Sequence, residues 1–333
     1  MSAMFLSVII PHYNIERTML ERCIDSIIQL NPAEGRYEII IIDDGSDTPP
    51  VWLNSRYNAE NIKFIQAEHR GPGAARNRGI YEACGKYIQF VDADDFLLQG
   101  NAIHRCIDML KKENPQILRF HYRYDTDTDI QTDKEPTFGN TISGAVYMKE
   151  NNLSGSPCTY FFRRELVIKK DIRFPEKIYH EDEEFNTILH YHAQTLIDSD
   201  AVLYEYCRRE GSTTTNNTAE FEEKRIDDLF RIIKRLSFFE KSQNSENNNI
   251  QKKAIERKLD MLCVDAILNM LYTGHTASGT HDQCRKQLSG IGLYPLRPGN
   301  HSIKYRMFRL LANSKNGLKI LRAITPKKKP LKR

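Results

Sequence analysis

Residues 87–95 read YIQFVDADD, a strand-like segment that is followed at once by a cluster of aspartates. Two earlier segments change character in the same abrupt way. Residues 5–10 (FLSVII) lead into PHYN at 11–14, and residues 38–42 (EIIII) lead into DDGS at 43–46. Helical spacing of apolar residues separates these strands, at 16–30 and again at 72–84. Apolar strands that alternate with helices predict an α/β fold with a parallel sheet covered on both faces.

The same pattern continues through the first two thirds of the chain. Further strands are predicted at 62–67 and 116–122 and later at 160–162 and 201–206, with helices at 102–112 and 183–192. Residues 125–155 look irregular or hairpin-like. From residue 220 the pattern is helical, with long helices at 220–241 and 250–271. We therefore expect a Rossmann-like, mostly parallel domain at 1–217, a helical region at 218–299 and a basic tail at 300–333.

Composition and charge exclude several classes of protein. The 333 residues are 40% hydrophobic and 28% charged, a globular composition. Of the 48 Lys and Arg residues, 11 lie in 300–333, where there is no Asp or Glu, so the other 299 residues carry 37 basic and 44 acidic groups, a net charge of −7. This acidic body argues against nucleic-acid binding. Seven scattered cysteines, no apparent signal peptide and no apolar run near 20 residues predict a cytoplasmic protein with reduced thiols.

The strand ends are the expected place for chemistry, because ligands of open parallel sheets bind beyond the carboxyl ends of the strands. Asp92 and Asp94 are two residues apart, so both can face one hard cation such as Mg²⁺ or Mn²⁺. A single acidic strand end is equally typical of ordinary turn chemistry. Three such ends on one edge favour a binding site.

Residues 71–79 (GPGAARNRG) partly resemble a dinucleotide-binding fingerprint. That fingerprint belongs on the first strand–helix turn, whereas this segment follows the third strand and has Arg76 in place of the last glycine. A better interpretation is a helix N-terminus with nearby arginines, suited to a phosphate or to ordering the neighbouring aspartates.

Two later segments each allow two interpretations. Residues 180–185 (HEDEEF) place acids in the first turn of a helix, which the helix dipole alone would favour, but together with the upstream aspartates they indicate a positioned general base. Residues 302–323 predict one amphipathic helix with basic flanks. Such a helix either lies on an anionic membrane or packs on the domain with its basic side in water. Its apolar side would be formed by Ile303, Met307, Leu310, Leu311, Leu318 and Leu321.

Five ordered motifs resemble the family-two inverting glycosyltransferases of the GT-A fold. They are S-V-I-I-P-x-Y-N at 7–14, I-I-D-D-G-S at 41–46, G-x-x-R-N-x-G at 73–79, F-x-D-A-D-D at 90–95 and E-D-x-x-F at 181–185. The similarity covers roughly residues 4–215. The resemblance implies a sugar transferase that uses a nucleotide-sugar donor, with a UDP-sugar as first candidate, and a divalent metal, Mn²⁺ or Mg²⁺. Its acceptor would be a hydroxyl of a saccharide or a lipid-linked glycan.

The resemblance also implies roles for individual residues. Asp182 would be the catalytic base with Glu181 as its neighbour, and Asp92 and Asp94 would bind the metal. The donor nucleotide would be bound by Pro11, Tyr13, Asn14, Asp44, Arg76, Asp92, Ala93 and Arg209.

One segment departs from the family pattern. Residues 204–212 resemble the stretch that closes over the donor diphosphate, but Cys207 stands where many members have a basic residue, and Arg208 is a candidate to compensate. Residues 211–217 would form a lid. The family's usual setting implies surface polysaccharide or glycolipid synthesis at the inner face of the plasma membrane, with residues 300–333 on the lipid. Two alternatives stay open: a nucleotidyltransferase-like enzyme and a non-catalytic nucleotide-sugar-binding protein.

Overall fold

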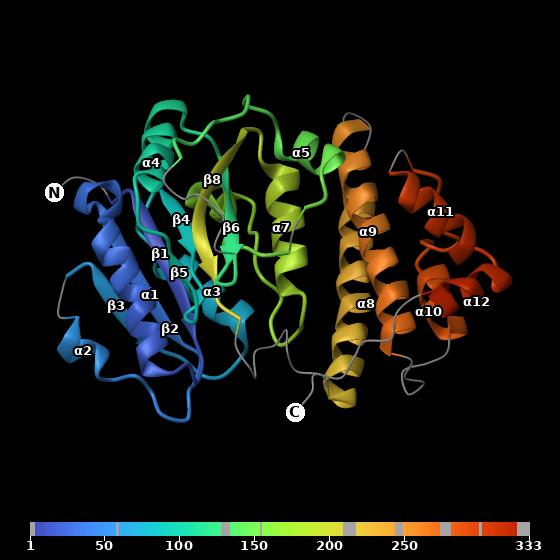
Figure 1. Ribbon diagram of the computed structural model, residues 1–333, viewed down its shortest axis with the longest axis horizontal. Helices are drawn as coiled ribbons and strands as arrows, with labels where there is room; N and C mark the ends of the chain where they lie inside the picture. Colours follow the sequence, from blue (N-terminus) through green and yellow to red (C-terminus); the bar gives the residue numbers. More distant parts are fainter. Residues whose placement is uncertain are drawn as a thin grey trace. The chain divides into compact units, whose positions relative to one another are not determined.

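Eight strands in the first two thirds of the chain form one sheet. They are β1 (Leu6–His12), β2 (Tyr37–Asp43), β3 (Ile62–Gln66), β4 (Tyr87–Phe90), β5 (Phe96–Leu97), β6 (Ile117–Tyr124), β7 (Tyr160–Arg163) and β8 (Leu196–Tyr206). Their order is β3-β2-β1-β4-β7-β6-β8-β5. The helices around the sheet are α1 (Arg17–Leu30), the 3₁₀ helix η1 (Pro32–Gly35), α2 (Leu53–Arg56), α3 (Pro72–Glu82), α4 (Ala102–Glu113), α5 (Gly144–Glu150), α6 (Arg164–Lys169) and α7 (Glu181–His192) (Figure 1).

The computed structural model describes residues 4–57, 60–127, 134–153, 155–208, 218–243, 249–273, 281–299 and 302–324. The chain divides into two compact units. Unit 1 comprises Met1–Tyr147 and Gly155–Arg209, and unit 2 comprises Met148–Ser154 and Glu210–Arg333. The sheet belongs to unit 1.

The sheet is mostly parallel, as its apolar strands predicted. β1 pairs in parallel with β2 on one side and β4 on the other, and β6 pairs in parallel with β8. β7 runs antiparallel to both β4 and β6, so β6 and β8 point the same way as β4. The carboxyl ends of β1, β2, β4, β6 and β8 therefore lie along one edge. The short β5 is also antiparallel, to β8.

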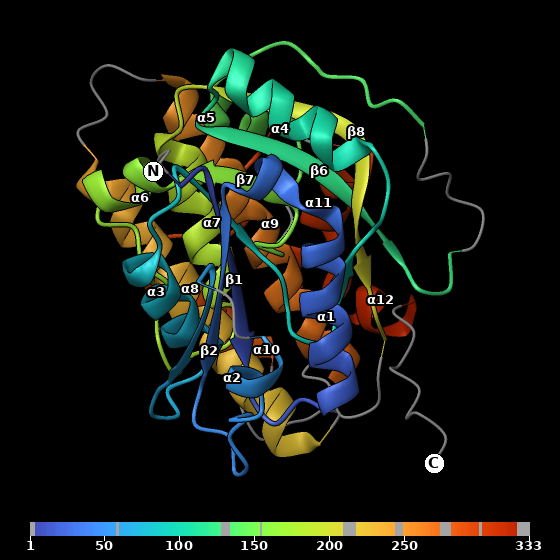
Figure 2. The same cartoon turned by 90° about the vertical axis from the view of Figure 1, so that its left-hand side faces the viewer.

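Helices cover both faces of the sheet, which is why β2 is buried along its whole length. Figure 2 shows α1 and α3 on opposite sides of β1 and β2. Helix α3 packs on β1 and β2, and Gly79 is the point of closest approach. A Cβ atom at Gly79 would lie within 3.0 Å of Ile9 Cγ2, so only glycine lets α3 lie this near to β1.

Unit 2 is helical in its described part. Its long helices α8 (Ala219–Ser242) and α9 (Asn249–Thr273) pack side by side, and α10 (His281–Gly290), α11 (Ile303–Ala312) and α12 (Lys315–Ile324) follow (Figure 1). Buried leucine and isoleucine side chains of these two helices belong to the core of unit 2: Leu229, Ile232 and Leu236 of α8, and Leu259 and Leu262 of α9. Within the described ranges, no helix has the length and apolar character that crossing a membrane requires.

Two sequence expectations need correction. Of the two descriptions given for residues 125–155, irregular or hairpin-like, the hairpin is wrong for the described part 134–153: Phe138 and Ile142 make single bridges to β8, and α5 follows. The segment 302–323 is not one helix. Helix α11 ends at Ala312, and the Ser314 hydroxyl accepts a hydrogen bond from the Gly317 amide, which caps a second helix.

The break also changes which apolar side chains are exposed. Leu318 and Leu321 are buried, whereas Ile303, Met307 and Leu310 are each more than 60% exposed. The apolar residues of the tail therefore do not share one side.

Candidate active site

Arg76 on α3 joins the end of β4 to the start of α7. Its Nη2 donates to Asp92 Oδ1 at 2.9 Å, and its Nη1 donates to Glu181 Oε1 at 2.8 Å. The guanidinium is buried and lies over the rings of Phe90 and Phe174, 5.9 and 5.5 Å from their centroids. Three of the motifs that the sequence singled out, which lie up to 105 residues apart, therefore meet at one side chain.

The charges around Arg76 stabilise one another. Burial alone would lower the pKa of Arg76, but the carboxylates of Asp92 and Glu181 outweigh this and raise its pKa, so the guanidinium stays charged. Burial raises the pKa of Glu181, although the nearby arginine opposes the shift. Of the aspartates after β4, Arg76 contacts Asp92, a contact consistent with the interpretation that residues 71–79 help to order these aspartates.

Asp182 lies beside this ion-pair network in the first turn of α7. Burial and then the carboxylates of Glu181 and Glu183 raise the pKa of Asp182 well above its usual value, and Arg76 only partly offsets them. Its Oδ1 accepts a hydrogen bond from the Glu183 amide at 2.8 Å. A Cβ atom at Gly155 would lie 3.3 Å from Asp182 Oδ2, so glycine leaves room for this carboxylate. A carboxylate with a raised pKa is a stronger base, which suits it to accept a proton near neutral pH.

The aspartates after β4 divide into two kinds. Asp95 is buried and accepts hydrogen bonds from the Tyr204 hydroxyl at 2.5 Å and the Cys207 amide at 2.8 Å. Burial, together with the charge of Asp92, raises the pKa of Asp95 to about 8. Asp92 and Asp94 are half-buried instead. Asp95 therefore anchors β8, and the other two carboxylates remain at the surface of the site.

The carboxylates of Asp92 and Asp94 fit a divalent cation that takes its remaining ligands from a bound substrate. No cluster of three or more His, Cys, Asp or Glu residues suited to a metal occurs among the residues that the structure describes. Mg²⁺ is commonly held by one or two carboxylates plus the phosphates of a substrate. In the described contacts Arg76 engages only Oδ1 of Asp92, so the hard oxygen donors of Asp92 and Asp94 fit an ion whose other ligands come from a diphosphate.

A second group of predicted residues lies at the ends of β1 and β2. The Asp44 carboxylate accepts hydrogen bonds from the amides of Arg70 and Gly71, both at 2.9 Å. Asp44 also lines a cavity of about 340 Å³ together with Ala67, Glu68, Arg70, Ala74, Ala75, Asn77, Arg78 and Glu176. His69 bonds to Asp44, and its ring stacks on Tyr13 with the centroids 4.2 Å apart. Tyr13 is 42% exposed and offers an aromatic face.

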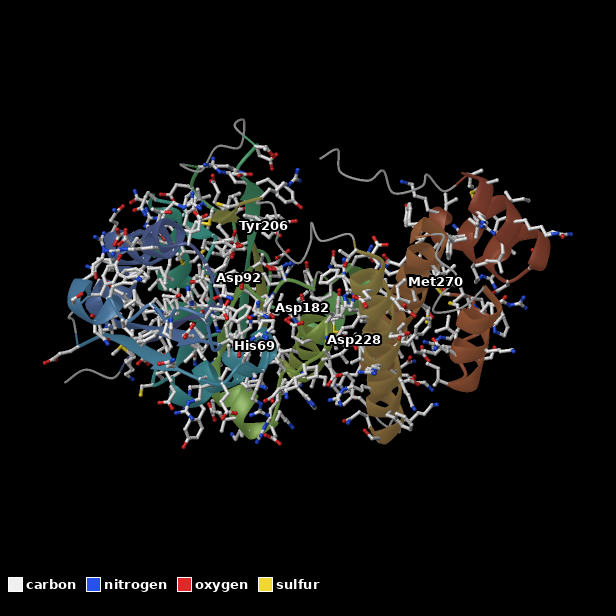
Figure 3. All side chains as sticks on the ribbon, turned by 90° about the horizontal axis from the view of Figure 1, so that it is seen from below. His69, Asp92, Asp182, Tyr206, Asp228 and Met270 are labelled. Carbon is white, nitrogen blue, oxygen red and sulfur yellow. The ribbon has the colours of Figure 1, made fainter. Side chains whose placement is uncertain are left out.

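The remaining predicted donor residues have less direct positions. Asn14 has a left-handed backbone, and its side chain exchanges two hydrogen bonds with Asp47, so it ties two loops together. Pro11 is half-buried at the end of β1, and the side chain of Ala93 is buried. Arg209 and the proposed lid at 211–217 lie outside the described residues. Figure 3 shows His69, Asp92, Asp182 and Tyr206 within unit 1.

The sequence did not reveal two further parts of the site. Arg22 of α1 donates from Nη2 to the Asp94 carbonyl at 3.0 Å and to Cys207 Sγ at 3.2 Å. The cation beside Cys207 is therefore Arg22, while Arg208 stacks on Tyr124. The second part is a buried hydrogen-bonded group of His12, Asp43 and Ser46.

Within this group, Asp43 Oδ1 accepts from the Ser46 hydroxyl at 2.5 Å and lies 3.1 Å from His12 Nδ1. The group links the end of β1 to the end of β2 and supports the loops that carry Tyr13 and Asp44. The polar strand ends were a visible signal for it, whereas no spacing in the sequence pointed to Arg22.

Part of the chain matches a known protein family. Residues 7–169 match the sequence profile of glycosyl transferase family 2. Residues 7–169 therefore form a family 2 domain. The chain is 31% identical over 216 residues to an uncharacterized glycosyltransferase of Escherichia coli K12, YibD, a match that covers 60% of each chain. The chain thus spans about 60% of the length of this curated relative.

Solved structures show the same fold. The structure of Staphylococcus aureus TarS residues 1–349 in complex with UDP-GlcNAc has a TM-score of 0.63 at 18% identity and covers 97% of this chain and 90% of that one. A mannosyltransferase from Pyrobaculum calidifontis in complex with GDP-Man and Mn²⁺ has a TM-score of 0.56 at 15% identity, covering 96% and 87%. The family 2 domain therefore has the GT-A fold that the sequence predicted.

Proposed function

We propose that this protein is an inverting, metal-dependent glycosyltransferase that moves a sugar from a nucleotide-sugar donor to a hydroxyl group of an acceptor. The observation that carries the proposal is the double ion pair of Arg76 with Asp92 and Glu181. These ion pairs bring the end of β4, which we propose binds the diphosphate, next to helix α7, which carries the proposed base Asp182. A nucleotide-binding protein without activity would not require that arrangement.

In the proposed reaction the acceptor hydroxyl attacks the anomeric carbon from the face opposite the leaving nucleoside diphosphate. Asp182 accepts the hydroxyl proton as the new glycosidic bond forms, and no side chain of the protein becomes covalently attached. Arg22, next to Asp94, adds positive charge where the leaving diphosphate gains negative charge. A divalent cation held by Asp92 and Asp94 would neutralise part of that charge when bound.

The donor half of the proposed site is the region of Tyr13 and Asp44. Tyr13 would stack on the base, and Asp44 would accept a hydrogen bond from it. The relatives support a nucleotide sugar, because the TarS structure contains UDP-GlcNAc and the mannosyltransferase structure contains GDP-Man with Mn²⁺. A UDP-sugar remains our first candidate, since the TarS structure, which has the higher TM-score of the two, contains UDP-GlcNAc.

We place the acceptor among saccharides or lipid-linked glycans, in the synthesis of a surface polysaccharide at the inner face of the plasma membrane. The support is the surface of α11 and α12. Ile303, Met307 and Leu310 form an exposed apolar row, and Ile320 and Ile324 are exposed on the next helix. The sequence of 300–333 contains basic but no acidic residues. Such a surface suits the interface of an anionic bilayer.

The donor half can be tested by titrating UDP into the protein by calorimetry, with and without Mn²⁺. We expect Mn²⁺-dependent binding that weakens at least tenfold in Asp94→Ala, since the variant loses a metal-binding carboxylate. Asp108→Ala, which removes an exposed aspartate of α4, is the matched control and should bind like the unmodified protein. Equal affinity of the Asp94 variant would rule out the metal role.

A further inference from the structure

Three tyrosines gather where β6 and β8 end, and we call them the tyrosine cluster: Tyr122, Tyr124 and Tyr206. The ring of Tyr124 lies 5.4 Å from that of Tyr122 and 5.6 Å from that of Tyr206, both nearly edge to face. The Tyr122 and Tyr124 hydroxyls are 3.4 Å apart. Tyr206 belongs to the segment 204–212, which resembles the stretch that closes over the donor diphosphate, whereas Tyr122 and Tyr124 have no part in the proposed donor site or base.

The tyrosine cluster lies on the same side of the sheet as the aspartates after β4. Tyr204 and Tyr206 are two residues apart on β8, so their side chains share one face of the strand. The Tyr204 hydroxyl reaches Asp95 and the Asp92 amide. Cys207, directly after Tyr206, donates its amide to Asp95. Tyr204 and Cys207, which lie before and after Tyr206 in the chain, are thus both hydrogen-bonded to the aspartates that follow β4.

The strand order separates the tyrosine cluster from the proposed donor half. Tyr13 and Asp44 follow β1 and β2, which lie on one side of β4, whereas β6 and β8 lie on the other side. Asp182 lies between them along this edge. It approaches Gly155, shortly before β7, and interacts electrostatically with Tyr160 on β7, the strand between β4 and β6. The proposed base therefore has the donor half on one side and the tyrosine cluster on the other.

The tyrosine cluster is partly exposed and uncharged, and the cationic side chain of Arg208 lies beside it. Tyr122 is 39% exposed, and Arg208 is exposed with its guanidinium carbon 4.0 Å from the centre of the Tyr124 ring. The hydrogen bond with Tyr124, and then burial, raise the pKa of Tyr122 to about 12, so its phenol is neutral at physiological pH. Tyr124 and Tyr206 are half-buried, so the ring of Tyr122 is the most accessible face of the cluster.

This combination matches the chemistry of a sugar ring. One face of a pyranose carries C–H groups that pack on an aromatic ring, and its rim carries hydroxyls that pair with phenol and guanidinium groups. We propose that the tyrosine cluster and Arg208 form the acceptor subsite and bind a saccharide ring of the acceptor. The proposal rests on the proposed function, because it assumes that a second sugar must lie beside Asp182.

The experiment is saturation-transfer NMR of the full chain with methyl β-D-glucopyranoside, methyl β-D-galactopyranoside and N-acetylglucosamine as probes. We expect at least one probe to receive saturation. In Tyr122→Ala its apparent Kd should rise about tenfold, because a stacking face is lost. Tyr122→Phe keeps that face and should retain most of the affinity. Tyr81→Ala removes another exposed tyrosine of unit 1, on α3, and should have no effect.

UDP affinity in the presence of Mn²⁺, measured on the same samples, separates this proposal from the proposed function. Loss of saccharide binding with unchanged UDP affinity in Tyr122→Ala supports the acceptor subsite. The proposal is overturned if no probe binds, if Tyr122→Ala binds the probes normally, or if the variant loses UDP affinity instead. Absence of UDP binding by the unmodified protein would count against the proposed function, whereas the saccharide result is judged from the probes alone.

Discussion

At the residue scale, the site depends on charges that hold one another in place. Arg76 is buried near the rings of Phe90 and Phe174 and is shared by Asp92 and Glu181. Removing either carboxylate would leave a buried charge with fewer partners, which is costly. Asp182 is held close to this network by backbone geometry, and its environment favours the protonated carboxyl group over the carboxylate.

The raised pKa of Asp182 predicts the pH dependence of transfer. Protonated Asp182 cannot accept the acceptor proton, so kcat should fall as the pH decreases through this raised pKa. We expect kcat to keep increasing with pH above the usual range for aspartate, near 3.9. The measurement is kcat at saturating donor and acceptor from about pH 5 to 9. A flat profile over this range would contradict the prediction.

Individual residues were partly predictable from the sequence. The places of Asp92 just after a strand and of Asp182 at the start of a helix were predictable, because strand ends and helix starts are local features that a sequence displays. Arg22 was not, because its contacts with Asp94 and Cys207 cross 72 and 185 residues of chain. Asn14 belongs to a recognisable motif, but its exchange of hydrogen bonds with Asp47 depends on how two loops pack.

At the element scale, the position of α3 determines where Arg76 can reach. Gly73 and Gly79 allow this helix to approach its neighbours. A Cβ atom at Gly73 would lie 2.5 Å from the Pro175 carbonyl oxygen, and one at Gly79 would overlap Ile9 of β1. The helix therefore sits close enough to β1 for one arginine to bond both β4 and α7.

Gly79→Ala tests this packing. The added methyl group must displace α3 or Ile9, and overpacking of this kind costs about 1–3 kcal/mol. We expect a lower urea midpoint for the transition of unit 1. The control is Gly290→Ala in α10, where nothing lies within 4 Å of the added Cβ, so little change is expected. A Gly79 variant as stable as the unmodified protein would show that α3 packs less tightly than described.

The helices and strands were more predictable than their directions. Long apolar runs such as β2 and periodic helices such as α1 appear in the sequence with boundaries close to those observed. The antiparallel direction of β7 did not, because a strand direction depends on the path of the preceding segment. The two-residue β5 is too short to have a periodicity. The break between α11 and α12 arises from capping by Ser314 rather than from any change in apolar spacing.

At the scale of the whole molecule, one chain combines a mildly acidic body with a basic, partly apolar end. That asymmetry was visible in the composition. The structure shows which apolar residues of this end are available to a membrane. Leu318 and Leu321 are buried, and the exposed row consists of Ile303, Met307 and Leu310. Membrane association would therefore use α11 and the exposed residues of α12.

We predict that the full chain co-sediments with vesicles that contain phosphatidylglycerol and that added salt weakens this binding. The double variant Met307→Gln and Leu310→Gln should bind about tenfold more weakly, because it loses exposed apolar area that would enter the lipid. Phe238→Gln removes a comparably exposed apolar side chain from α8 and serves as the control. Equal sedimentation of the double variant and the control would argue against this surface.

The most direct test of the whole account is the Asp182→Asn variant, assayed for sugar transfer and for Mn²⁺-dependent UDP binding. Asparagine keeps the shape of the side chain but cannot take up the acceptor proton. We predict that kcat falls by about 10²–10⁴-fold, the usual contribution of a general base, while UDP affinity stays unchanged. Near-normal turnover by this variant would contradict the account.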